Sequence, residues 1–137
     1  MKKVERNLGR VEKIFFPDLN IDLNAKIDTG AYRTVIHVDG IEELDGKLTF
    51  WIGERSNKFI FDDFNIIDVK NSFGKNQKRY SIKLKMTLGE VTYVVSVSLT
   101  NRKNMKFPCL IGRRFLYKYG FIVDVRKKNL HDRNKKA

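Results

Sequence analysis

Cysteine and histidine are nearly missing from this chain, whose 137 residues include one cysteine and two histidines. Cys109 can form no disulfide within the chain, and its apolar neighbours predict a small buried core residue rather than a nucleophile. A catalytic zinc ion needs three protein ligands and an open position. His131 lies in a charged segment, His37 lies in a β-branched one, and the sequence has neither a His-Glu-x-x-His pattern nor a glycine-rich phosphate loop ending in lysine. We therefore expect no metal and no cofactor.

Long apolar runs are also missing, and the chain has only two prolines. No stretch reaches the length of a signal peptide's apolar region or of a membrane span, so we expect a cytoplasmic protein without membrane contact. The scarcity of proline leaves little room for proline-rich linkers. With 42% hydrophobic residues and 12% aromatics, the composition is that of a globular protein.

Acidic residues are few beside basic ones, 16 against 28, which gives a net charge of +12. Such a charge favours nucleic acid or acidic polypeptides as partners. We predict a basic arm over residues 1–7, one β domain over residues 8–125 and a basic tail over residues 126–137. The charged ends could be solvated segments that aid solubility or could contact an acidic partner, and the sequence leaves both readings open.

Alternation of apolar and polar residues predicts an all-β domain. The clearest pair of strands covers residues 80–88 and 91–99, joined by a two-residue turn at Gly89-Glu90. Helical patterns are scarce, and the one helix that we expect covers residues 113–119 and stops at Gly120. The other expected strands cover residues 9–16, 21–28, 34–38, 47–52, 58–61, 65–70 and 121–125. Many short strands at this spacing suit a closed or partly closed barrel.

Two stretches far apart in the sequence carry the functional argument. The first, residues 25–31, is a short apolar strand that stops at Asp28-Thr29-Gly30. It presents a carboxylate and a hydroxyl beside a backbone that glycine leaves uncovered. The second, residues 109–116, reads as a buried strand, then Gly112-Arg113, then a short helix. Taken alone, Asp28 could be an acid that caps a turn.

Together these stretches resemble the retropepsin-like aspartic peptidases. More narrowly, the chain resembles a bacterial single-domain branch that carries the label ATP-dependent zinc protease and occurs alongside ATP-grasp glutamate ligases. The resemblance covers about residues 8–125 and implies a barrel of the retropepsin (acid protease) type. The features behind the narrower resemblance are His37, Asn71-Ser72-Phe73-Gly74, residues 99–105, residues 110–116 and Val123-Asp124-Val125.

The resemblance implies an active site shared between two chains. One carboxylate cannot both activate a water and protonate a substrate, whereas two carboxylates about 3 Å apart share one proton and can divide these tasks. Since this chain supplies one Asp-Thr-Gly, a homodimer would complete the pair. The implied catalytic residues are Asp28, Thr29 and Gly30. The implied substrate-binding residues are Ala31, Tyr32, Phe73 and Gly74, and the implied supporting residues are Ile111, Gly112 and Arg113.

Tyr32 departs from the retropepsin pattern, in which an acidic residue usually stands at this position and pairs with the arginine equivalent to Arg113. The polar stretch over residues 71–79 falls where the resemblance places a flap that closes over a peptide or protein substrate, although it could also be an ordinary exposed hairpin loop. The basic charge and the association with glutamate ligases make glutamate-rich chains a candidate substrate. The alternative function is a non-catalytic basic β-barrel that binds nucleic acid or an acidic protein partner.

Overall fold

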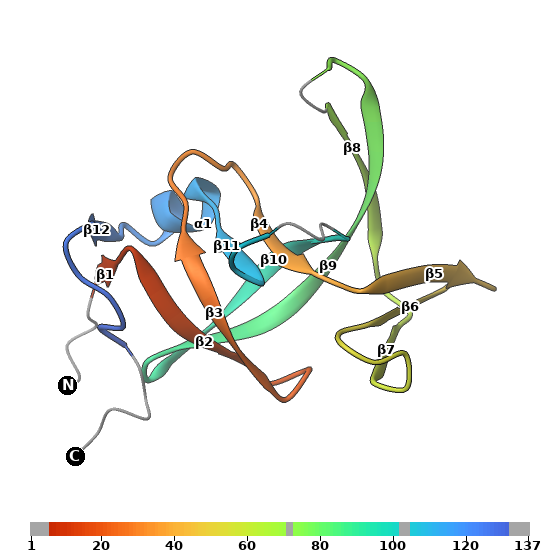
Figure 1. Cartoon of the computed structure of the whole chain (residues 1–137), viewed down its shortest axis with the longest axis horizontal. Coiled ribbons are helices and arrows are strands. Elements are labelled where there is room, and N and C mark those ends of the chain that lie inside the picture. The colour runs from red at the N-terminus through yellow and green to blue at the C-terminus, as the bar shows by residue number, and fades with distance from the viewer. Residues whose placement is uncertain (1–5, 71–72, 102–104, 132–137) are drawn as a thin grey trace.

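The computed structural model describes residues 6–70, 73–101 and 105–131. This part of the chain is built mainly from strands, with one short helix (Figure 1). In chain order the elements are β1 (Asn7–Gly9), β2 (Val11–Phe16), β3 (Ile21–Ile27), β4 (Thr34–His37), β5 (Gly40–Leu44), β6 (Lys47–Trp51), β7 (Lys58–Phe61), β8 (Asn65–Lys70), β9 (Asn76–Leu88), β10 (Val91–Thr100), β11 (Cys109–Ile111), α1 (Arg113–Lys118) and β12 (Ile122–Asp124).

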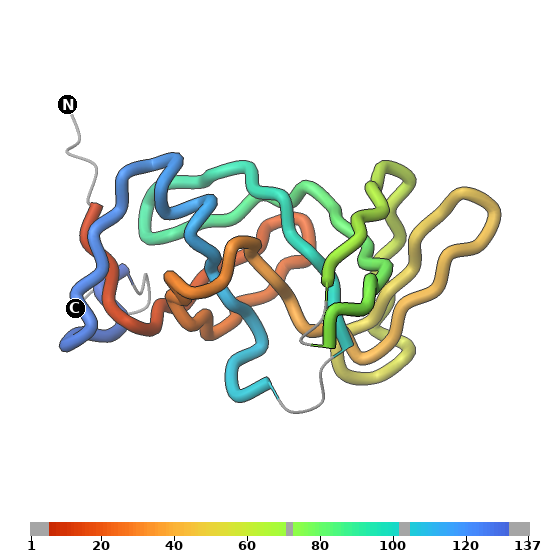
Figure 2. The backbone as a smooth tube through the Cα atoms, turned by 90° about the horizontal axis from the view of Figure 1, so that it is seen from above, coloured from red at the N-terminus to blue at the C-terminus, as the bar shows by residue number. Residues whose placement is uncertain are grey.

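Six strands close into a barrel. The largest sheet has the strand order β10-β4-β11-β3-β2-β9-β8, and a further pairing of β10 with β9 closes the ring and leaves β8 outside it. In Figure 2 the cyan-green tube of β9 and β10 lies next to the red-orange tube of β2 and β3, in agreement with the pairing of β2 with β9. The predicted all-β barrel with one short helix near the end of the chain is therefore confirmed.

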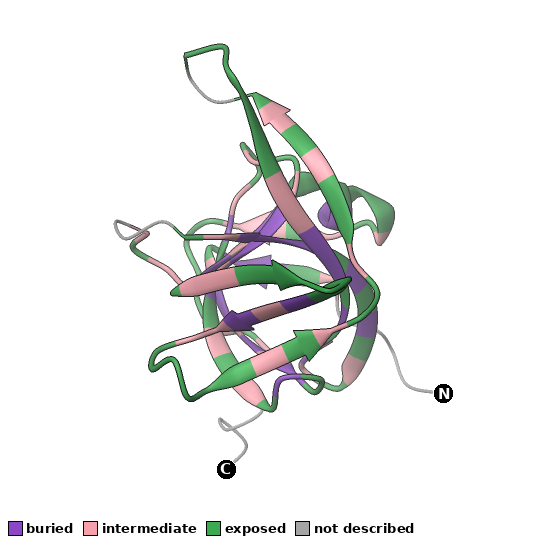
Figure 3. Ribbon diagram, turned by 90° about the vertical axis from the view of Figure 1, so that its right-hand side faces the viewer, coloured by how far each residue is buried: buried purple, intermediate pink, exposed green. Residues whose placement is uncertain are grey.

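The core fills the barrel with alternate residues of its strands. In β9 and β10 the residues Ile82, Leu84, Met86, Val95 and Val97 are buried, while the side chains between them are mostly exposed. Figure 3 shows this alternation as changing colours along single strands. Alternation follows from the two-residue period of a strand with one face in the core. The predicted buried position of Cys109 is confirmed, because its side chain is completely buried.

Two extensions leave the barrel. A separate sheet contains β5, β6 and β7, and the β8–β9 hairpin projects as an arm at the top of Figure 1. The sequence Asp39-Gly40 predicts a turn after the strand over residues 34–38, but this prediction was wrong in part, since Gly40 begins β5 and pairs with Trp51. The predicted loop over residues 71–79 was too long, because β9 already begins at Asn76 and pairs there with Lys70. Residues 71 and 72 lie outside the described part of the chain.

Residues 126–131 return to the start of the chain. The Asn129 N–H donates to the Val11 carbonyl oxygen at 2.8 Å, close to the pair of parallel strands β1 and β12. The completely buried Glu12 accepts hydrogen bonds from the N–H groups of Gly9, Leu130 and His131 at 2.7, 3.2 and 3.0 Å. Leu130 and His131, which were expected to be part of a charged tail, thus satisfy the hydrogen-bonding capacity of a buried carboxyl group. The division of the chain into an arm over residues 1–7, a domain over residues 8–125 and a tail over residues 126–137 stays a prediction.

Helix α1 ends one residue before the predicted end at residue 119. Its last residue is Lys118, and Gly120 takes a φ of 66°, a left-handed conformation that glycine adopts without strain. Phe115 and Leu116 face the core. Among the described residues, no helix is long and apolar enough to cross a membrane.

Candidate active site

The Asp28 loop (residues 28–33) leaves the end of β3 directly beside β11. These two strands run parallel, and Ile27 lies opposite Ile111. The Asp28 N–H donates to the Ile111 carbonyl oxygen at 2.9 Å. The Asp28 carboxylate oxygen Oδ1 in turn accepts the Gly30 N–H at 3.1 Å. These bonds fix both the backbone and the side chain of Asp28 at the end of a buried strand.

Gly112 and Arg113, at the start of α1, hold the Asp28 loop by hydrogen bonds and by close packing. The Arg113 N–H donates to the Ala31 carbonyl oxygen at 2.7 Å, and Arg113 Nη1 donates to the Gly30 carbonyl oxygen at 3.1 Å. A Cβ on Gly112 would lie 2.5 Å from the backbone carbon and oxygen of Arg33. Since such a contact is too close for any side chain, only glycine lets the loop lie this near to the start of α1.

Thr34 completes the attachment, because its Oγ1 accepts the Gly112 N–H at 3.3 Å. The structure thus brings together the two stretches that the sequence places about 80 residues apart. Asp28 through Tyr32 lie on one side of the junction, and Ile111 through Arg113 lie on the other. The catalytic and supporting roles of these residues stay predictions.

Three guanidinium groups surround the Tyr32 ring. The Cζ atoms of Arg33, Arg113 and Arg114 lie 5.5, 5.4 and 6.0 Å from its centroid. A cation over an aromatic face is attracted to the ring quadrupole. Arg113 therefore contacts the residue at position 32 by a cation–π interaction, where the retropepsin pattern would give an ion pair with an acidic residue. Tyr32 remains 49% exposed and can contact a ligand.

The Asp28 loop is open to solvent in the single chain. Asp28 is half-buried, whereas Thr29 and Gly30 are exposed. Phe73 and Gly74 lie at the tip of the β8–β9 arm, where Phe73 is 87% exposed and Gly74 has a φ of 79°. Figures 1 and 2 show this arm standing apart from the Asp28 loop of the same chain. The structure does not bring Phe73 and Gly74 to the carboxylate within one chain.

His37 is paired with an acid rather than gathered into a metal-binding cluster. Its Nε2 lies 3.2 Å from Asp39 Oδ1. The Gly53 N–H donates to the Asp39 carboxylate, and this bond, aided by His37, lowers the pKa of Asp39. Within residues 6–70, 73–101 and 105–131, no three His, Cys, Asp or Glu side chains are grouped so that they could hold a metal ion. Burial raises the pKa of the Cys109 thiol, which keeps it protonated and unreactive.

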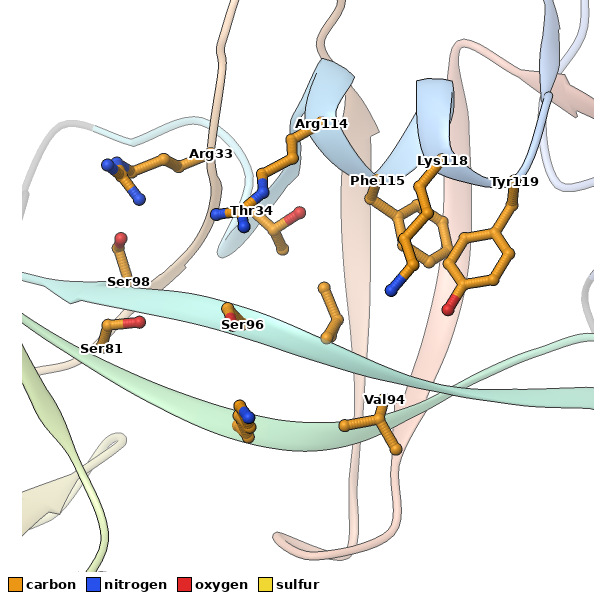
Figure 4. Close-up of a pocket in the computed structure, with 12 residues that line it drawn as sticks. Arg33, Thr34, Ser81, Val94, Ser96, Ser98, Arg114, Phe115, Lys118 and Tyr119 are labelled. Atoms are coloured by element: carbon orange, nitrogen blue, oxygen red, sulfur yellow. The ribbon is translucent and has the colours of Figure 1, made fainter.

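A cavity of about 380 Å³ lies between α1 and the outer face of β9 and β10, and sequence reasoning missed it. We call it the α1 pocket; Figure 4 shows the side chains that point into it. Its lining residues are Arg33, Thr34, Ser81, Lys83, Val94, Val95, Ser96, Ser98, Arg114, Phe115, Lys118 and Tyr119. Only the polar alternation along β9 and β10 hinted at it, because the residues come from four separate segments.

Known proteins resemble this chain at several levels. The model of the family described as "Retropepsin-like aspartic endopeptidase RimB" matches residues 7–134. The crystal structure of Lpg0085, a protein of unknown function from Legionella pneumophila, is 28% identical, with a TM-score of 0.75, and the match covers 94% of this chain and 100% of that one.

Two curated relatives are 30% and 31% identical over 117 residues, from Shewanella pealeana and Shewanella halifaxensis. Each is named "Probable alpha-L-glutamate ligase", and each match covers 77% of this chain. The chain spans about a quarter (26%) of the length of these relatives. The family match covers nearly the whole chain and includes both stretches that meet at the Asp28 loop. The chain therefore belongs to the family of the retropepsin-like aspartic endopeptidase RimB.

Proposed function

We propose that the chain is an aspartic endopeptidase whose active site forms when two copies place their Asp28 carboxylates side by side. The observation that carries the proposal is the Asp28 loop itself. Its backbone is bonded to Ile111 and Arg113, yet on a single chain Asp28 is only half-buried and Thr29 is exposed. A rigid half-site that is open on one side suits completion by a twin chain.

In the dimer the two carboxylates would share one proton. The ionised Asp28 would take a proton from a water molecule, and the protonated Asp28 of the other chain would polarise the peptide carbonyl group. Water then adds to the carbonyl carbon, and proton transfer to the leaving nitrogen breaks the C–N bond without a covalent enzyme intermediate. Thr29 would link the two loops across the axis, and the exposed Gly30 would let the substrate backbone approach.

Tyr32 and the β8–β9 arm would bind substrate on either side of the carboxylates. Tyr32 and Ala31 continue directly from the Asp28 loop. The tip of the arm carries Phe73 and Gly74, which would press on a bound chain as a flap. The net charge of +12 supports acidic, glutamate-rich chains as substrates. The names of the curated relatives, which refer to glutamate ligation, support the same substrate class.

The first test measures assembly and cleavage together. Sedimentation equilibrium from about pH 4 to pH 8 should give about twice the mass of the 16.1 kDa chain. Cleavage of glutamate-rich peptides should fall about 1,000-fold in Asp28→Asn. The matched control is Asp22→Asn, which makes the same change at an exposed position of β3 and should retain activity.

A strict monomer at high micromolar concentration, or full cleavage by Asp28→Asn, would overturn the proposal. Binding of nucleic acid with a steep salt dependence, unchanged in Asp28→Asn, would favour the non-catalytic barrel instead. A preference for basic peptides would retain the peptidase and reject the acidic substrate class.

A further inference from the structure

We propose that the α1 pocket binds a nucleoside diphosphate or an organic diphosphate of the same shape. Asp28 is not among the residues that line this pocket, and the proposed peptidase chemistry does not use it. Its cavity of about 380 Å³ falls within the usual size range of small-molecule sites. Its chemistry indicates which kind of molecule would fit.

The charge of the lining is entirely positive. Arg33, Lys83, Arg114 and Lys118 line the pocket, and no acidic side chain does. In the described part of the chain, none of these four cations forms an ion pair with a carboxylate. A phosphate monoester carries a charge of about −1.5 to −2 near neutral pH, so two phosphate groups match four cations better than one group does.

Hydroxyl groups accompany the cations. Ser96 lies directly opposite Lys83, and Ser98 lies directly opposite Ser81 in the pairing of β10 with β9. Residues that are directly opposite share one face of the sheet, so these groups point together towards α1. Guanidinium, ammonium and hydroxyl groups are the donors that bind phosphate oxygens. The backbone of this wall is rigid, because it belongs to the closed barrel.

The two ends of the pocket differ. In Figure 4 Arg33, Ser81 and Ser98 lie at one end, with Thr34 and Arg114 beside them. At the other end, Lys118 lies next to three apolar or aromatic side chains, namely Val94, Phe115 and Tyr119. A ligand with a doubly charged head and a flat ring fits this polarity. The phosphates would lie at the Arg33–Arg114 end, and the ring would lie against Tyr119.

Calorimetry on the full chain tests the proposal with four probes: adenosine diphosphate, pyrophosphate, adenosine and a tetraglutamate peptide. Adenosine diphosphate should bind most tightly, pyrophosphate should bind more weakly, and adenosine should show no measurable binding. Arg114→Met should raise the dissociation constant for adenosine diphosphate about tenfold or more. The matched control is Arg55→Met, which removes the same charge from an exposed loop and should change it by less than about twofold.

If Arg114→Met and Arg55→Met changed the dissociation constant for adenosine diphosphate equally, the nucleotide would be attracted by net charge alone. That result would overturn the proposal. Tetraglutamate binding as tight as adenosine diphosphate, and equally sensitive to Arg114→Met, would overturn it in favour of an acidic-peptide site. The binding measurement is independent of cleavage, since Asp28→Asn should bind adenosine diphosphate like the original chain. Absence of binding with intact cleavage rejects this inference alone, and binding without cleavage rejects the peptidase alone.

Discussion

The Asp28 loop and the α1 pocket share Arg33, which ends the loop and lines the pocket, but they are built in opposite ways. The loop uses residues that are contiguous in sequence, is held by backbone hydrogen bonds, and in our proposal presents half of an active site. The pocket uses side chains from four segments and is complete within one chain. A motif can therefore reveal a site that is incomplete, while a site that is complete can leave no motif.

The largest expected effect comes from Gly112→Ala, which breaks both regions at once. A Cβ at this position collides with the backbone of Arg33, which belongs to the loop and also lines the pocket. We expect the free energy of unfolding to fall by about 3 kcal/mol in urea titrations, together with loss of cleavage and of adenosine diphosphate binding.

The control for this change is Gly46→Ala. Gly46 has a φ of 76° and no atom within 4 Å of an added Cβ, so it reports backbone strain without a collision. If Gly112→Ala were no more destabilising than Gly46→Ala, the close packing of the two regions would not depend on Gly112.

Glu12→Gln should separate stability from function. The buried carboxyl group accepts three backbone N–H groups, and an amide has only one oxygen to offer them. We expect a loss of about 2 kcal/mol in the free energy of unfolding, while both regions keep their geometry. Urea unfolding checks the first expectation and adenosine diphosphate calorimetry checks the second. Glu54→Gln, at an exposed loop position, serves as the control and should change little.

The neighbours Arg113 and Arg114 allow a direct comparison of the two regions. Arg113 donates to the Gly30 carbonyl oxygen, and Arg114 lines the pocket. In Arg113→Met the larger loss, about tenfold, should be in cleavage, and in Arg114→Met it should be in adenosine diphosphate binding. Parallel losses in both assays for both variants would mean that the two regions act as one site.

The smallest effect is expected at Asp39, which belongs to neither region. The Gly53 N–H lowers the pKa of Asp39 below its ordinary value of 3.8. A carboxyl group whose pKa is lower in the folded state stabilises the fold above pH 3.8, and the contribution is lost as the pH falls through the folded value. Because Asp39 is exposed, the substitution Asp39→Asn should lower the free energy of unfolding at neutral pH by less than about 1 kcal/mol.

Thermal unfolding from about pH 3 to pH 7 checks this sign. The difference in unfolding temperature between Asp39→Asn and the original chain should become smaller towards the acidic end of the range. Asp62→Asn, at an exposed position between β7 and β8, is the control. A difference that stays constant with pH would assign the effect to packing.

Much of the barrel could be predicted from sequence, because its strands have one face in the core. The two strands of the β9–β10 hairpin alternate closely over residues 80–88 and 91–99, and that pattern predicted the pair of strands and the turn between them. The pattern failed for strand segments that pack neither face against the core. The segment Asn76–Arg79 belongs to the projecting arm, where polar residues pair without burial, so it read as a loop. Strand β5 has exposed acids at Glu42 and Glu43 and was missed for the same reason.

The candidate active site could be located from sequence because its two halves are short and contiguous. Asp28-Thr29-Gly30 alone is a weak signal, and it becomes specific only when the stretch around Gly112-Arg113 follows it in the right order. The α1 pocket could not be, since Ser96, Lys83 and Arg114 are ordinary residues of an exposed strand face or helix until the fold brings them together. The sequence showed that Tyr32 stands where an acid usually pairs with Arg113, but the cation–π contact between its ring and the guanidinium group is visible only in the structure.

The buried Glu12 carboxyl group also has a consequence for the order in which the protein is assembled during synthesis. Glu12 leaves the ribosome early, but Leu130 and His131 follow it by 118 and 119 positions. Until they emerge, Gly9 is the only one of its three partners available, and enclosing the group would leave it incompletely bonded. We therefore expect the β2 end of the barrel to stay hydrated until these two residues have been synthesised. Its closure is a late event, which a chain shortened before Leu130 would never reach.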